Sequence, residues 1–110
     1  KEQNKKPDTP RVVSIDGLKI KVRLLTKDDV KLRNLPTNTT GVVIMEIAND
    51  SPINYLKVNT IIVEAQKKKI KTIGELDNLV KIAKRRSDKN ILIAIFNEQN
   101  QKRYIGVKLD

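Results

Sequence analysis

Aliphatic and charged residues alternate with a period of two near the start of the chain. From residue 18 to residue 24, every second residue is Leu, Ile or Val, and the residues between them are Lys or Arg. This pattern is typical of a strand that buries one side. Residues 11–15 before it are also β-prone, and Asp16 and Gly17 favour a turn because glycine accepts a positive φ. The pattern predicts two strands joined by a tight turn.

Further strands are predicted where Val, Ile and Leu are concentrated. Such runs cover residues 42–47, 60–65, 91–96 and 103–109. The first of them is apolar enough for a central strand. Residues 66–70 are predicted to form a hairpin turn leading into a brief strand, and the polar residues 97–102 are predicted to join the last two strands.

One long helix is predicted to begin after Thr72. Glu75 stands three residues later, as a capping box requires, and the basic residues 84–86 lie at the negative, C-terminal end of the helix dipole. Two shorter helices are expected. One covers residues 27–33, and a very short one covers residues 53–56.

The long helix carries its apolar residues in two neighbouring stripes. The stripes consist of Leu76, Leu79 and Ala83 on one side and Ile73, Asp77 and Val80 on the other. One stripe can pack on the sheet while the other borders a groove.

Length and composition place these elements in one small domain. The chain has 110 residues, which is enough for a single modest core. Residues 1–10 are polar and contain two prolines, so we interpret them as a linker before a domain at 11–110. No apolar run approaches the ~20 residues of a membrane-spanning helix, and the start lacks the apolar stretch of a signal peptide. No transmembrane segment is therefore expected.

The chain is strongly basic, with a formal net charge of +10 from 23 Lys and Arg against 13 Asp and Glu. Much of the excess is Lys scattered along the chain. The two basic clusters, residues 67–69 and 84–86, have no interleaved aromatic residues for base stacking. We interpret them as a solvated turn and a helix end, and predict no nucleic-acid partner. A basic adaptor for nucleic acid or a membrane surface stays an alternative.

Candidate catalytic chemistry is sparse. The chain contains no His and no Cys, which excludes a Ser-His-Asp or Cys-His arrangement within it and imidazole or thiolate metal ligation. The four glycines form no phosphate-binding loop. Asp28, Asp29 and Asp50 are interpreted as helix caps. The sequence predicts no catalytic residue, no metal and no cofactor.

A glycine turn, an alternating strand and a later two-striped helix together suggest a binding function. If the strand after the turn lies at a sheet edge, its unpaired N–H and C=O groups can bind an extended peptide. The alternative is that this strand is simply paired within the sheet. Periodicity alone favours this alternative.

Four short motifs carry a family resemblance. They are Gly-Val-Val-Ile-Met-Glu-Ile at 41–47, Asp-Ser-Pro at 50–52, Leu-Lys-Val-Asn-Thr-Ile-Ile at 56–62 and Ile-Gly-Glu-Leu at 73–76. In this order and spacing the chain resembles a bacterial PDZ domain, and most of all the second, C-terminal PDZ domain of the HtrA/Deg serine proteases. The resemblance covers about 15–109. Asn59 replaces a family glycine, and we expect it to adopt a left-handed conformation.

The resemblance implies an α+β fold and a peptide groove. The fold would be a small, partly open β-barrel or sandwich of five to six strands, capped by one long and one or two short helices. The groove would lie between the strand after the carboxylate-binding loop and the long helix. Its residues would be Ile15, Asp16, Gly17, Leu18, Lys19, Ile20, Lys21, Val22, Ile73, Asp77 and Val80. Asp16 places a negative charge where a ligand carboxylate would dock.

The resemblance also implies a function in protein quality control. The chain would be a non-catalytic PDZ domain of a periplasmic serine endopeptidase. Its partners would be extended or C-terminal peptide segments of unfolded substrate proteins, and the protease and PDZ domains of the same or neighbouring subunits. An oligomerisation module with a vestigial groove is the main alternative.

Overall fold

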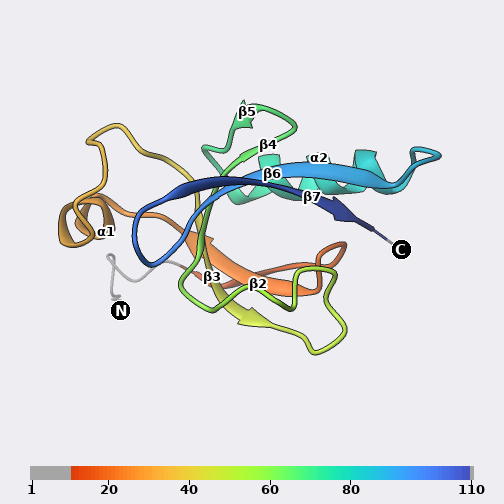
Figure 1. Cartoon of the computed structure of the whole chain (residues 1–110), viewed down its shortest axis with the longest axis horizontal. Coiled ribbons are helices and arrows are strands. Elements are labelled where there is room, and N and C mark those ends of the chain that lie inside the picture. The colour runs from red at the N-terminus through yellow and green to blue at the C-terminus, as the bar shows by residue number, and fades with distance from the viewer. Residues whose placement is uncertain (1–10, 110) are drawn as a thin grey trace, which may run out of the picture.

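An open antiparallel sheet with two helices makes up the fold in this computed structural model, which describes residues 11–109 (Figure 1). The elements are β1 (Val13–Ile15), β2 (Ile20–Leu24), α1 (Lys27–Leu32), β3 (Val42–Ile47), β4 (Ile61–Ala65), β5 (Lys68–Lys69), α2 (Ile73–Lys84), β6 (Asn90–Phe96) and β7 (Lys102–Lys108). The predicted α+β class is confirmed, and the fold is consistent with a PDZ-like one. The linker predicted at residues 1–10 lies outside the described residues.

The strands follow the order β1-β2-β3-β4-β6-β7, with β5 paired to β4 alone. Every pairing is antiparallel, and the long β6–β7 hairpin runs from Asn90 opposite Lys108 to Phe96 opposite Lys102. The sheet has seven strands where five to six were expected, because the brief strand β5 and the short β1 both join it. In the described part of the chain the sheet does not close into a barrel.

Both faces of the central strands are buried, which explains why their sequences are apolar without alternation. On β3, Val42 and Ile44 belong to the larger core, which also contains the buried face of α2. Val43, between them, belongs to a smaller core on the other side, which contains Val30 of α1. The two helices therefore cover opposite faces of the same sheet.

The loop before β4 differs from expectation in one place and agrees in another. Residues 53–56 form successive turns and no helix, although Ile53 is fully buried. Asn59 has a φ of 79°, as predicted, and its N–H donates to the Ile44 carbonyl at 2.8 Å. The left-handed residue thus turns the chain from this loop into β4. Within residues 11–109, neither helix is long and apolar enough to cross a membrane.

The first turn of α1 is joined to β2 by a paired carboxylate. Asp29 accepts two hydrogen bonds from the Arg23 guanidinium, at 2.7 and 3.0 Å, and completes a capping box with Thr26. The bonds from Arg23 lower the pKa of Asp29 to about 2, and those from Thr26 add to the effect. The predicted capping role of Asp29 is confirmed.

This pair should make stability depend on pH in the acid range. Because the folded-state pKa of Asp29 is depressed, its contribution is present above pH 4 and is lost as the pH falls towards about 2. We expect Asp29→Asn to lower the free energy of unfolding at pH 7 by about 1 to 2 kcal/mol, and the difference from wild type to shrink below pH 3. Urea denaturation across pH measures this. The adjacent exposed Asp28→Asn is the matched control, and an equal loss there would contradict the assignment.

Candidate functional site

The turn between β1 and β2 is compact and hydrogen-bonded. The Leu18 N–H donates to the Ile15 carbonyl at 3.1 Å, and the Lys19 N–H donates to the Asp16 carbonyl at 3.2 Å. The residue with positive φ is Lys19, at 56°, and not Gly17. The predicted turn is therefore present, but the reason given for its glycine was wrong.

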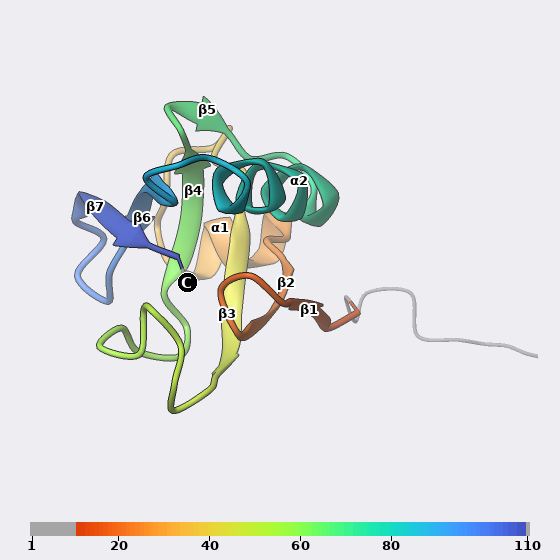
Figure 2. The ribbon, with the colours of Figure 1, turned by 90° about the vertical axis from the view of Figure 1, so that its right-hand side faces the viewer.

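Gly17 is needed for space. A Cβ at this position would lie 2.3 Å from Cγ1 of Val80 and 3.3 Å from Cδ of Lys84, both on α2. In Figure 2 the turn lies directly beneath α2. The turn and the C-terminal half of the helix thus pack against each other at a point where no side chain fits between them.

The resemblance places Ile73, Asp77 and Val80 of α2 along the peptide groove, but these three side chains differ in burial. Val80 is fully buried and belongs to the same core as Ile15 and Leu18. It is a packing residue and does not line an open groove. Ile73 and Asp77 are half-buried, as a groove wall would be, and Asp77 forms an ion pair with Lys81 at 3.1 Å. Of the core stripe, Leu76 and Ala83 are buried and Leu79 is half-buried.

Strand β2 has no free edge over its first three residues. On one side Ile20, Lys21 and Val22 pair with β3. On the other side the same three residues pair with Ile15, Ser14 and Val13 of β1. The condition of a free strand edge is therefore not met at these residues, and the alternative of a strand paired within the sheet is what the structure has. Beyond the ladder with β1, Arg23 and Leu24 of β2 pair with β3 alone among residues 11–109.

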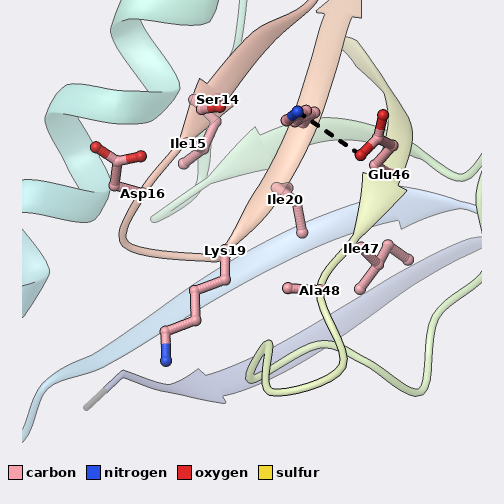
Figure 3. Close-up of a pocket in the computed structure, with 9 residues that line it drawn as sticks. Ser14, Ile15, Asp16, Lys19, Ile20, Glu46, Ile47 and Ala48 are labelled. Atoms are coloured by element: carbon pink, nitrogen blue, oxygen red, sulfur yellow. Dashed lines mark ion pairs between the residues drawn. The ribbon is translucent and has the colours of Figure 1, made fainter.

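A shallow hollow of about 250 Å³ lies beside the turn, where β2 begins and β3 ends (Figure 3). Its lining includes predicted site residues from β1, the turn and β2, and adds three residues of β3 and its end, namely Glu46, Ile47 and Ala48. Lys21 lies 3.8 Å from Glu46, so part of the positive charge of the hollow is neutralised. Asp16 adds a negative charge on the side of the turn near α2 (Figure 3).

Two further residues hold the turn, and neither was predicted to contact it. Ser51 is buried, and its hydroxyl donates to the Leu18 carbonyl at 2.6 Å and accepts from the Ile53 N–H at 3.1 Å. Asp50 caps no helix. It is exposed and forms an ion pair with Lys19 at 2.9 Å, which lowers the pKa of Asp50. The Asp-Ser-Pro motif was the sequence signal at these residues. It did not reveal the contact with the turn, because Ser51 and Leu18 are 33 positions apart in the sequence.

The residues gathered here present main-chain groups of two strands and a few charged side chains, Asp16, Lys19, Lys21 and Glu46. In the described residues, 11–109, no cluster of three acidic side chains could hold a metal ion.

Two solved structures resemble this chain in fold. The structure of the HtrA-type protease AlgW with a decapeptide matches with a TM-score of 0.63 and 21% identity, over 84% of this chain and 28% of that chain. A variant of AlgW with a decapeptide matches with a TM-score of 0.67 and 19% identity, over 94% of this chain and 30% of that chain. The fold is therefore similar to that of a segment of this HtrA-type protease. No protein-family model matches the sequence, and no curated protein matches it.

The AlgW likeness extends over most of this chain but under a third of the AlgW chains. At these identities the shared property is the fold, and it agrees with the resemblance to a PDZ domain of this protease family.

Proposed function

We propose that this chain is a non-catalytic PDZ domain of a periplasmic HtrA-type serine protease, corresponding to the second, C-terminal PDZ domain. It binds extended segments of unfolded proteins by strand addition to β2 beside α2, in the place that β1 occupies in this structure. The observation that carries the proposal is the combination of fold and site: a hairpin turn packed against the long helix, in a fold shared with structures of an HtrA-type protease holding a decapeptide.

The charges around the turn favour main-chain recognition over capture of a ligand carboxylate. Lys19 and Lys21 each have an acidic partner, Asp50 and Glu46, so neither is a free cation for a carboxylate. Asp16 is an exposed negative charge at the same turn. Affinity would therefore come from backbone hydrogen bonds, and specificity from side chains at alternate ligand positions.

Peptide titration tests the proposal directly. We expect decapeptides rich in Val and Ile to bind saturably, and the amidated form to bind at least as tightly as the free acid because Asp16 repels a carboxylate. N-methylation of alternate amides removes the donors a strand needs, so affinity should fall by about tenfold or more. Fluorescence anisotropy with labelled peptides measures this. Equal binding of N-methylated and unmodified peptides would refute strand addition.

A second candidate function is assembly, and one observation favours it. Because β1 already pairs with β2, the groove would be vestigial and the domain would serve contacts between subunits. In that case no decapeptide would bind, whereas deletion of residues 11–110 from the parent protease would change the number of subunits per particle, which sedimentation equilibrium measures.

A further inference from the structure

Strand β1 has the geometry that an added peptide would have. It is extended, it is antiparallel to β2, and its three residues face Val22, Lys21 and Ile20 in register. A peptide that added to β2 on the side away from β3 would need these same partners. One segment of the chain therefore stands where the ligand of the proposed function would bind.

The side chains of β1 are anchored at one end only. Ile15 is fully buried in the larger core, beside the turn that packs on α2. Ser14 is exposed, and Val13 and Val12 are 39% and 49% exposed. Three residue pairs and one buried side chain hold the strand, so local opening should cost much less than global unfolding.

We propose that β1 is an intramolecular occupant of the peptide site, and that peptide binds to β2 only when β1 is released. The proposal rests on the proposed function and names how that site is regulated. Apparent affinity is then the intrinsic affinity multiplied by the fraction of molecules with β1 released. Any change that holds β1 in place should weaken peptide binding, and any change that loosens it should strengthen binding.

A reversible crosslink can hold β1 in place. Ser14 and Lys21 are exposed and directly opposite each other on β1 and β2. Facing residues of an antiparallel pair have Cα atoms about 4.5 to 5.5 Å apart, which lies within the range of a disulfide. The chain contains no cysteine, so Ser14→Cys with Lys21→Cys allows one intramolecular disulfide only. The reduced form of the same variant is the matched control.

A single substitution can loosen β1. Val13→Gly removes the side chain opposite Val22 and lowers strand propensity, whereas Val12→Gly makes the same change just outside the ladder. Neither residue belongs to the turn or to α2. The two variants separate release of β1 from a general effect of glycine.

The probe is a labelled peptide, Arg-Val-Val-Ser-Ile-amide, which copies residues 11–15. We expect the oxidised double-cysteine protein to bind it about tenfold or more weakly than the reduced protein, and Val13→Gly to bind it about threefold to tenfold more tightly than Val12→Gly. Equal binding by the oxidised and reduced forms, or weaker binding by Val13→Gly, would overturn the proposal and place the peptide on the outer edge of β1. No binding by the reduced form and by Val13→Gly would overturn peptide capture itself, and this inference with it.

Discussion

Gly17→Ala should lower the free energy of unfolding by about 2 to 3 kcal/mol, an unusually large effect for one methyl group. The added Cβ would lie 2.3 Å from Cγ1 of Val80, well inside contact distance. Val80 cannot rotate away cheaply, because a β-branched side chain on a helix has one strongly preferred rotamer and this one is fully buried. The turn must therefore move away from α2. Urea denaturation of both proteins measures the loss.

A matched glycine and a double mutant isolate the cause. Gly106 lies in β7, and a Cβ there would meet nothing within 4 Å, so Gly106→Ala should change the unfolding free energy by about 1 kcal/mol or less. Introducing Gly17→Ala into Val80→Ala should cost clearly less than it does in wild type, with a coupling of about 1 kcal/mol or more. The same cost in both backgrounds would show that the contact with Val80 is not responsible.

The sequence predicted the parts of the fold that depend on local pattern. The run at 42–47 became β3, and Thr72 with Glu75 formed the capping box that begins α2. Asn59 took the left-handed conformation, which asparagine adopts more readily than most residues other than glycine. In each case the residues within a few positions were enough to determine the result.

The errors at the site come from contacts between distant segments. The reason for Gly17 lies in Val80, 63 positions away by subtraction of the two residue numbers. The pairing of β1 with β2 decides whether a strand edge is free, yet alternation of side chains is the same in a paired and an unpaired strand. Turns replaced the helix expected at 53–56. Here the Ser51 hydroxyl bonds the Leu18 carbonyl and the Ile53 N–H, and a helical pattern in the sequence does not reveal these contacts.

Ser51→Ala should also be strongly destabilising, by about 2 to 3 kcal/mol. The serine hydroxyl joins two backbone groups: it donates to the Leu18 carbonyl at 2.6 Å and accepts from the Ile53 N–H at 3.1 Å. Both bonds are buried, so no water replaces them freely when the hydroxyl is removed. The cost is that of two polar groups losing a buried partner, and urea denaturation measures it.

The location of this loss distinguishes the role of Ser51 from that of an ordinary buried serine. Because the hydroxyl is bonded to the turn, hydrogen exchange in Ser51→Ala should accelerate at the Leu18 and Lys19 amides more than at the amides of β6. The exposed Ser87→Ala should change neither stability nor exchange. Uniform acceleration across the sheet would instead assign Ser51 to global stability. Faster exchange confined to the turn would mean that Ser51 holds the segment following β1, and hence the position of β1 itself on β2.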